Sequence, residues 1–395
     1  MGAGLSNGCF GGLARTQRRR RLKILFPIGT LYPSQQGGPS NTVYWLAKAL
    51  VKAGIEVTCV TTDILTQGVP RDKWLSTDYG EVIYCSTRHA MFAVRMMWES
   101  FKKLFHCDAV HLTSVFNTGS LFMAFCSTLV GKPLVWSPRG EFDKEALIYS
   151  FHKKKWVLWL VKRVFAKKVF FHATSPMEWF DIKNVMGDKV QIIEIPNYME
   201  LPEKRCTKSS ERYILFIGRI HPIKAVDNLI RAIGLSKKFT ASGFSLWIAG
   251  NDKNEYADSL KAMAESLNIT HNVKFIGHVE GLEKQELYAG AHFTLMPSHT
   301  ENFGNVVIES LAQGTPVIAS TGTPWKKLEE KKAGFWCGNE PAELSRQIER
   351  AIEMNEEEYK QYRRNAFQLA TQEYNIYENI HIWIEAYEKL INSAK

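Results

Sequence analysis

Short apolar runs alternate with longer amphipathic stretches along most of this chain of 395 residues. From Leu22 onward, runs such as Leu22–Ile28 and Glu56–Thr61 are separated by helix-like stretches such as Asn41–Ala53. This alternation is typical of βαβ units, whose strands pair as a parallel sheet with helices on its faces. The length suits two or three such domains and far exceeds what one small core needs. The sequence therefore predicts an α/β protein with doubly wound, Rossmann-like sheets.

The alternation is interrupted by a polar segment from Tyr198 to Arg212 and starts again at Tyr213–Ile217. After Pro316–Ala319, three further helical stretches follow, around Ala342–Met354, Glu356–Glu373 and Ile376–Asn392, with no strand between them. We therefore expect a disordered basic leader at residues 1–21, an N-terminal Rossmann-like domain at 22–200, a C-terminal one at 201–375 and a closing helix at 376–395. Two open α/β domains leave a cleft at the carboxyl ends of their strands, where such sheets bind ligands.

Positive charge is concentrated in the first half of the chain. Residues 1–205 carry 28 basic and 16 acidic side chains, whereas the whole chain has a formal net charge of +10. This asymmetry indicates an anionic partner for the first half. Met1-Gly2 with Ser6 also fits the myristoylation pattern, and the alternative is a disordered or mis-started leader ahead of the first strand.

The seven cysteines form no Cys-x-x-Cys pair. Their odd number argues against a zinc site and a disulfide framework, so we expect no bound metal and a reducing, cytoplasmic compartment. The uncharged run from Ala109 to Gly131 has the length of a membrane span, but polar residues interrupt it. We interpret this run as a strand, a loop and a helix.

Each domain begins with a turn that suits a diphosphate. In the first, Gly37-Gly38 stands between a strand and a helix, where backbone N–H groups can approach an anion closely. In the second, Gly218 ends a strand and is followed by Arg219 and Lys224, two cations able to hold phosphate oxygens. Taken singly, these features are also compatible with an ordinary turn and ordinary surface cations.

Two glutamates eight positions apart, Glu301 and Glu309, flank the turn into a later helix. Glu309 comes about one helical turn after Asn305, and an inward-facing carboxylate there can accept hydrogen bonds from both hydroxyls of a ribose. The amides of Phe303, Gly304 and Asn305 stand at the helix N-terminus, which favours a phosphate. The pattern predicts a site for a nucleoside diphosphate.

Two further segments, Ile195-Pro196-Asn197 and Gly314–Ala319, join the motifs described above. Together they make the chain resemble glycosyltransferase family 4 from about Leu22 to Ala386. Glu301 to Glu309 matches the family's E-x7-E signature. The resemblance implies a GT-B fold, in which two Rossmann-like domains face a cleft and the last helix crosses back to the first domain. It also implies metal-independent sugar transfer from a UDP- or GDP-sugar with retention of anomeric configuration, and no cofactor beyond this co-substrate.

The resemblance implies roles for the matching residues as well. Arg219 and Lys224 would hold the diphosphate and stabilise the departing nucleotide, Glu309 would bind the ribose, and the candidate catalytic residue Glu301 would sit beside the donor sugar. The implied donor-binding residues are Gly38, Arg219, Lys224, Phe303, Gly304, Asn305 and Glu309.

One segment departs from the family pattern. Many members place a histidine near the donor sugar, whereas this chain has Ser137-Pro138-Arg139-Gly140-Glu141, which resembles a branch associated with cell-envelope polysaccharides such as lipopolysaccharide and capsule. Arg139 is therefore a second catalytic candidate, and its alternative role is a structural ion pair with Glu141 or Asp143. His111, at a strand end, is a candidate for the acceptor side, and its alternative is a hydrogen-bonded structural histidine.

Two stretches of the basic half, Lys153–Lys168 and Met91–Phe105, mix aromatic and cationic side chains. On a helical wheel, Leu160 and Val161 lie on the apolar face of the first stretch, and Trp159 lies among lysines on the opposite face. Tryptophan among lysines suits an anionic membrane interface, and the alternative is ordinary surface helices. We see no nucleic-acid-binding module and expect no nucleic-acid partner.

These observations predict a retaining glycosyltransferase of cell-surface polysaccharide biosynthesis, acting on a glycan or a polyprenyl-diphosphate-linked oligosaccharide. We expect it in the cytoplasm, peripherally at the inner face of the plasma membrane. A nucleotide-sugar epimerase of the same fold is the alternative, although the sequence offers no identifiable acid and base groups for it. A catalytically silent scaffold fits poorly with four site residues in place, Arg219, Lys224, Glu301 and Glu309.

Overall fold

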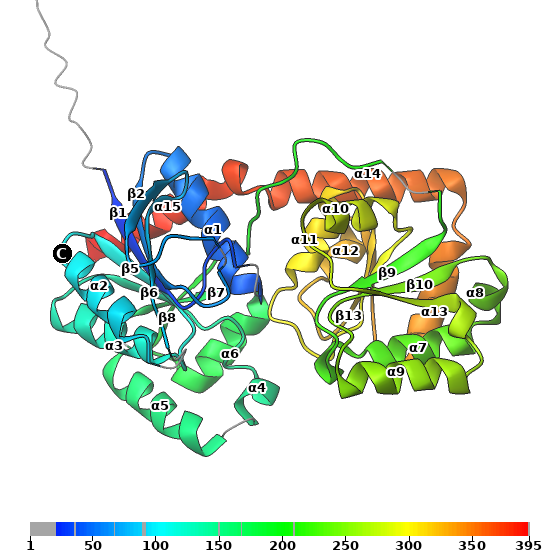
Figure 1. Cartoon of the computed structure of the whole chain (residues 1–395), viewed down its shortest axis with the longest axis horizontal. Helices are drawn as coiled ribbons and strands as arrows, with labels where there is room; N and C mark the ends of the chain where they lie inside the picture. The colour runs from blue at the N-terminus through cyan, green and yellow to red at the C-terminus, as the bar shows by residue number, and fades with distance from the viewer. Residues whose placement is uncertain are drawn as a thin grey trace, which may run out of the picture.

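The computed structural model describes residues 21–34, 37–66, 68–88, 92–148, 151–166, 168–207 and 210–393. The chain forms two α/β lobes side by side (Figure 1). Residues 1–20 of the predicted leader lie outside the described residues. So do Met91, Lys167 and the side chain of Lys153, which belong to the two predicted membrane-binding stretches.

The N-terminal domain is built on an eight-stranded sheet in the order β3-β4-β2-β1-β5-β6-β7-β8. All neighbouring strands are parallel except β3 and β4, which form an antiparallel hairpin at one edge. The strands are β1 (Lys23–Ile28), β2 (Glu56–Thr62), β3 (Trp74–Thr77), β4 (Gly80–Cys85), β5 (Ala109–Thr113), β6 (Leu134–Ser137), β7 (Phe170–Ala173) and β8 (Gln191–Glu194). The central strands read as short apolar runs because they are buried on both faces.

Helices follow these strands where local sequence signals place them. The side chain of Asn117 accepts from the amides of Gly119 and Ser120 and so caps α3, and Ser175 caps α6 with Pro176 as its first residue. The helices of this domain are α1 (Gly37–Lys52), α2 (Val94–Leu104), α3 (Thr118–Leu129), α4 (Lys144–Ile148), α5 (Phe151–Val164) and α6 (Pro176–Met186).

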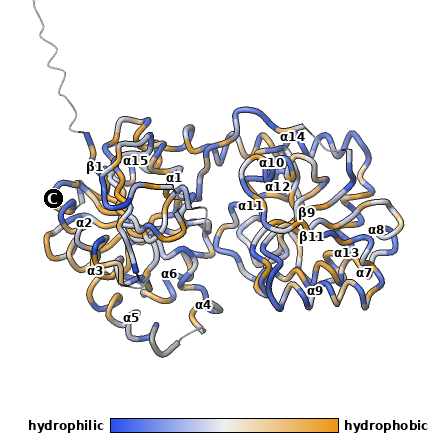
Figure 2. The backbone as a smooth tube through the Cα atoms, in the orientation of Figure 1, coloured by the Kyte–Doolittle hydropathy of each residue, from blue (hydrophilic) through white to orange (hydrophobic). Residues whose placement is uncertain are grey.

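The C-terminal domain contains a six-stranded parallel sheet in the order β11-β10-β9-β12-β13-β14. Its strands are β9 (Tyr213–Ile217), β10 (Ser245–Ala249), β11 (Val273–Gly277), β12 (Thr294–Met296), β13 (Val317–Ser320) and β14 (Gly334–Cys337). Its helices include α7 (Val226–Leu235), α8 (Lys237–Ala241), α9 (Glu255–Ser266), α10 (Gly281–Gly290), α11 (Asn305–Ala312), α12 (Lys327–Glu330) and α13 (Pro341–Ile352). Apolar residues run through the inner strands of both lobes (Figure 2).

The last two helices connect the domains. α14 (Glu356–Glu373) packs on the C-terminal domain, and α15 (Ile376–Ser393) returns to the N-terminal domain (Figure 1). There Trp383, Tyr387 and Leu390 join the core formed by β1, β2 and α1. Two Rossmann-like domains are thus joined both by the linker after Ile195 and by the end of the chain, which confirms the predicted fold class.

Candidate active site in the interdomain cleft

The turn after β9 carries the two predicted cations of the C-terminal domain. Arg219 is exposed, and Lys224 ends a short 3-10 turn, Pro222–Lys224. The Lys224 ammonium is in close contact with the Glu301 carboxylate, and each side chain is about one-fifth exposed. Arg219 forms no ion pair with any residue of the part of the chain that the structure describes. Arg219 and Lys224 are thus two cations, at least partly exposed to solvent, that follow the end of a strand and suit the binding of a diphosphate.

The loop between β12 and α11 is held beside this turn by the backbone. The His299 amide donates to the Ile223 carbonyl at 2.9 Å, and the Glu301 amide donates to the Gly322 carbonyl at 3.0 Å. Gly304 has φ +84°, and a Cβ there would lie 2.7 Å from the Met296 sulfur, so the loop needs glycine at this position. The loop thereby carries Glu301 toward Lys224 and starts α11 in the cleft.

The N-terminus of α11 offers backbone amides at the cleft. The Phe303 side chain is buried against Trp325 and Tyr374, so Phe303 presents only its backbone. The first amides of a helix lack partners within the helix and favour an anion. On the opposite wall, a Cβ on Gly38 would lie 3.4 Å from the Asn305 amide nitrogen. Gly38 and the start of α11 therefore face each other across the cleft.

Glu309 lies in the second turn of α11 and points toward α10. Its carboxylate accepts from Lys284 Nζ at 2.7 Å and from the Tyr288 hydroxyl at 2.8 Å. Burial, followed by the charge of Glu309, raises the pKa of Tyr288 well above its usual value. Glu309, Lys284 and Tyr288 line an interdomain cavity of about 410 Å³, together with Tyr32, Asn41 and Tyr44 of the N-terminal domain. The carboxylate therefore opens onto this cavity, which none of Gly38, Arg219, Lys224 and Glu301 lines.

Arg139 is a half-buried residue beside Asn197. Its guanidinium donates to Asn197 Oδ1 at 2.7 Å, while Nε and the second terminal nitrogen are buried and have no partner in the described part of the chain. It pairs with neither predicted carboxylate, since Glu141 instead accepts from Ser114 and the backbone of Val115 and Phe116. Burial lowers the pKa of Arg139. Its backbone has φ +58°, a strained conformation for a residue with a side chain.

His111 is enclosed inside the N-terminal domain. One ring nitrogen lies 2.7 Å from the Tyr387 hydroxyl of α15, and the other lies 2.8 Å from Ser137 Oγ. Burial, followed by the charges of His172 and Arg139, lowers the pKa of His111 well below its usual value. These contacts are those of a hydrogen-bonded structural histidine, the alternative to a role on the acceptor side.

Several residues that hold this site were missed by sequence reasoning. Lys284 and Tyr288 come from α10, and nothing in their local sequence distinguishes them from surface and core residues. Glu178 and Asn302 hydrogen-bond across the cleft. Ser175-Pro176-Met177-Glu178 has the spacing of a capping box, which signals the start of α6 but not a contact of Glu178 with the other domain.

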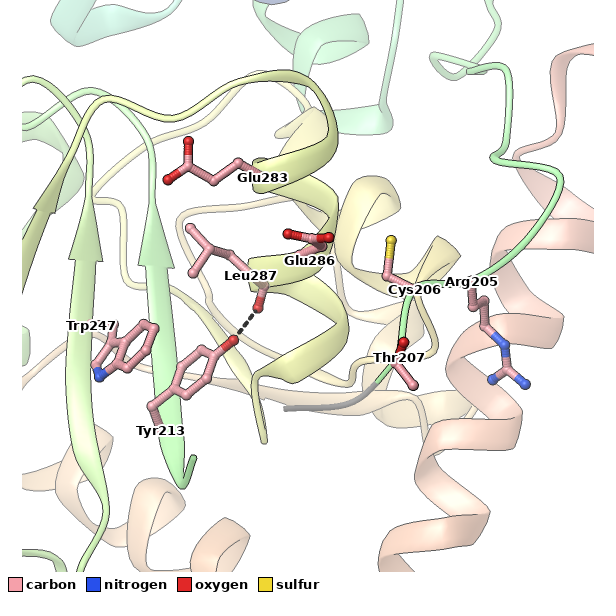
Figure 3. A pocket seen from close by; sticks show the side chains of 8 residues that line it. All are labelled: Arg205, Cys206, Thr207, Tyr213, Trp247, Glu283, Glu286 and Leu287. Atoms are coloured by element: carbon pink, nitrogen blue, oxygen red, sulfur yellow. Dashed lines mark hydrogen bonds between the residues drawn. The ribbon is translucent and has the colours of Figure 1, made fainter. Parts of the chain in front are cut away.

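A second cavity, of about 480 Å³, lies on the C-terminal domain (Figure 3). Tyr213 and Trp247 stack with centroids 4.0 Å apart on one side of it, and Arg205 and Glu286 lie on the other. None of the predicted site residues lines it.

The helices α2, α3, α5 and α6 carry exposed aromatic and apolar side chains. Trp156 and Trp159 of α5 are 75% and 60% exposed, and Trp98 and Phe105 are exposed at α2. Leu160, expected on the buried face of α5, is 43% exposed, so the apolar face of this helix is narrower than the wheel indicated. Within the described residues, no helix has the length and hydropathy needed to cross a bilayer.

Two Rossmann-like domains that face each other across such a cleft define a GT-B protein. Residues 36–198 match the family model for Glycosyltransferase Family 4, and residues 199–369 match the model for Glycosyl transferases group 1. Together the two matches span residues 36–369, so the chain is a glycosyltransferase similar to family 4. An uncharacterised glycosyltransferase of Methanocaldococcus jannaschii is 27% identical over 272 residues, which cover 66% of this chain and 63% of that protein. The curated relatives that head the comparison are matched over less than two thirds of their length.

Solved structures share the fold over nearly the whole chain. Anabaena HepE, solved with UDP and glucose, superposes with a TM-score of 0.72 at 18% identity and covers 93% of this chain and 100% of its own. WaaG, a glycosyltransferase involved in lipopolysaccharide biosynthesis, superposes with a TM-score of 0.66 at 16% identity and covers 93% of this chain and 99% of its own. At these identities, the similarity concerns the fold.

Proposed function

We propose that this glycosyltransferase moves a sugar from a UDP- or GDP-sugar to a glycan or polyprenyl-diphosphate-linked acceptor of cell-surface polysaccharide biosynthesis, with retention of configuration. The observation that carries the proposal is the contact between Lys224 and Glu301 beside the N-terminus of α11. The contact joins a cation to a carboxylate in the loop that leads into α11, whose first amides lack partners within the helix. The UDP and glucose bound by HepE support the donor class, and the role of WaaG supports the pathway.

The cations of the β9 turn would take the charge of the leaving group. Arg219 and Lys224 would bind the diphosphate together with the first amides of α11, and this fixed positive charge needs no metal ion in the proposed reaction. Lys224 would then exchange its carboxylate partner for a phosphate oxygen. Glu309 would bind the ribose hydroxyls, and Glu301 would face the donor sugar.

Retention follows from attack on the face that the leaving group vacates. The acceptor oxygen bonds to the anomeric carbon as the bond from that carbon to the phosphate oxygen breaks. The acceptor proton passes to a donor phosphate oxygen, and the nucleoside diphosphate leaves with it. The reaction needs neither a protein nucleophile nor a cofactor beyond the sugar donor, and stabilisation of the departing diphosphate supplies most of the rate.

The N-terminal domain would dock on the inner face of an anionic plasma membrane that carries the acceptor. Fifteen of the eighteen large apolar side chains that are exposed in the described residues belong to residues 21–200. Lys154, Lys155, Lys162 and Arg163 accompany the tryptophans on α5. Indole rings among cations suit the headgroup region, and each cation near such a surface contributes about 1 kcal/mol.

The donor proposal is tested by incubating the protein with UDP- and GDP-sugars and membrane-extracted lipid-linked glycans. We expect nucleoside diphosphate release with one donor and a product whose anomeric configuration, read by NMR coupling constants, matches that donor. Conversion of one nucleotide sugar into another would instead identify the epimerase. An inverted anomer would refute the retaining assignment.

The membrane proposal is tested by flotation with vesicles of phosphatidylglycerol and phosphatidylcholine. The wild type should float at low salt, and Trp156→Ser/Trp159→Ser should lose at least half of the bound fraction. Leu235→Ser/Leu282→Ser, which removes two exposed apolar side chains from the C-terminal domain, is the matched control and should float normally. Wild-type protein that stays at the bottom of the gradient would rule out docking.

A further inference from the structure

Glu178 of α6 is a buried carboxylate that the proposed reaction does not use. It is 2% exposed. One oxygen accepts from the Gly140 amide at 2.8 Å, and the other accepts from the Thr174 amide at 2.7 Å. In a capping box, this glutamate would return to the backbone N–H of the N-cap residue, here Ser175. Glu178 instead extends past its helix to the turns that follow β6 and β7, which lie at the cleft.

Asn302 of the C-terminal domain lies directly against this carboxylate. The nitrogen and oxygen of an amide are distinguished by their partners. The orientation that places Nδ2 toward Glu178 brings it to 3.0 and 3.1 Å from the two carboxylate oxygens. Gly140 has φ +81°, and a Cβ there would lie 2.9 Å from the Asn302 Cβ, so this turn admits Asn302 only because it contains glycine. The Asn302 carbonyl also accepts from Ser175 Oγ at 3.3 Å.

A second set of cross-cleft hydrogen bonds lies at the start of α11. Asn197 Nδ2 donates to Asn305 Oδ1 at 3.0 Å, and Asn305 Nδ2 donates to Thr42 Oγ1 at 3.3 Å. The anchors at Asn302 and Asn305 flank Phe303 and Gly304. On the other side of Glu301, Thr300 Oγ1 donates to Asp143 Oδ2 of the N-terminal domain at 3.3 Å, so the loop that bears Glu301 is anchored to the other domain on both sides.

We propose that Glu178 and Asn302 are a positioning pair that clamps the Glu301 loop against the N-terminal domain in the closed enzyme. The inference rests on the proposed function, because it gives the clamp the task of setting Glu301 beside the donor sugar. Asn302 is the neighbour of Glu301 in the chain, so its anchor limits where that carboxylate can lie. Neither residue of the pair touches the reacting atoms.

The charge of Glu178 makes the clamp testable by an isosteric change. Asn302→Asp replaces two donated hydrogen bonds by a second carboxylate about 3 Å away, and two carboxylates at that distance cannot both stay ionised. Arg139 and Asp181 are the other charged groups that interact with Glu178, and both are present in wild type and variant. On acidification the variant pair can share one proton and hydrogen-bond again.

At pH 8 we expect Asn302→Asp to lower kcat at least tenfold, while the Kd of UDP or GDP, measured by calorimetry, changes less than twofold. With nucleotide bound, small-angle scattering should give a larger radius of gyration than for the wild type. At pH 6 the ratio of variant to wild-type kcat should rise several-fold. Asn254→Asp makes the same change at the cap of α9, where aspartate is an equally good cap, and should match the wild type in every readout.

Asn302→Ala removes the clamp without adding charge and covers the case in which the aspartate variant folds poorly. It should show the same larger radius and lower kcat, without the recovery at pH 6. Wild-type kcat and radius of gyration in both variants would overturn the clamp. Scattering and nucleotide binding need no turnover, so failure to find a sugar donor would leave these two tests of the clamp in force.

Discussion

Lys224 is neutralised by the same carboxylate that is proposed to face the donor sugar. The ion pair is only partly buried, so its own contribution to stability is small. The pair is important because Lys224 can exchange Glu301 for the donor: a diphosphate offers Lys224 more negative charge than one carboxylate does.

We therefore expect Lys224→Ala to lower kcat on the order of 100-fold or more, the size found when one preorganised charge-stabilising group is removed. Lys224→Arg should retain part of the activity, because the charge remains but the contact geometry changes. Lys253→Ala removes an exposed lysine of the same domain and is the matched control. Steady-state kinetics measure these effects on variants that keep the wild-type melting temperature. An unchanged kcat in Lys224→Ala would show that Lys224 has no role in the reaction.

Asp181 of α6 lowers the stability of the folded protein in a pH-dependent way. Burial first, and then the negative charges of Asp143 and Glu178, raise its pKa to about 6. The folded protein therefore holds this proton more tightly than the unfolded chain does. The stability that the proton contributes is present at low pH and is lost as pH rises toward and through 6. Asp181→Asn should raise the melting temperature at pH 8, and this gain should shrink as pH falls toward 4. A pH-independent gain would show that charge is not the cause.

At the residue scale, a contact could be expected from sequence where both partners stand at strand ends or helix starts. Lys224 contacts Glu301 and Gly38 lies near Asn305, and the carboxyl ends of parallel strands gather such residues at one edge of a sheet. Arg139 and His111 were harder, because their partners are Asn197 and Tyr387, which are distant in sequence. Glu178 and Asn302 were missed for the same reason, since each is part of a site only through the other domain.

At the scale of elements, buried strands and amphipathic helices were predictable, while the edge of the first sheet was not. β3 alternates exposed and half-buried residues and follows a polar stretch, so it lacks the apolar run of a central strand. Its pairing with β4 depends on the tight turn between them. β14 was not predicted either, since its four residues form too short a run to stand out between α12 and α13.

α15 gives a direct test of how one element supports the other domain. Trp383 is 3% exposed and packs between His172 and Tyr387. Trp383→Ala should lower the free energy of unfolding by about 3 to 5 kcal/mol, the usual cost of truncating a buried aromatic side chain. Trp159→Ala, at an exposed tryptophan, should stay within about 0.5 kcal/mol of the wild type. Chemical denaturation measures both, and equal effects would contradict the packing role of α15.

For the whole molecule, the sequence predicted two domains and a cleft between them, but not which residues of the two domains contact each other across that cleft. The surfaces of the domains also differ, since exposed aromatic side chains gather on the N-terminal domain. That difference follows from tertiary packing, which decides which side of each amphipathic helix stays uncovered.

Because α15 completes the N-terminal core, residues 21–200 alone should fold poorly. Without α15, the surface around His111 and His172 would be open to water, and the hydrogen bond from His111 to Tyr387 would be lost. We expect this fragment to be largely insoluble and a fusion of residues 21–200 to 375–393 through a flexible linker to be soluble. The soluble fraction after expression and the near-ultraviolet circular dichroism measure the outcome. A stable, well-folded fragment without α15 would contradict it.

The return of α15 also sets an order of events during synthesis. A ribosome adds on the order of 5 to 20 residues per second, so the first sheet must wait roughly 10 to 40 seconds for its last helix after residue 200 has been made. In that interval the surface on which Trp383 and Tyr387 later pack is apolar and uncovered. The domain that is translated first is therefore completed last, and nascent chains of this protein are expected to need chaperone cover until the C-terminus leaves the ribosome.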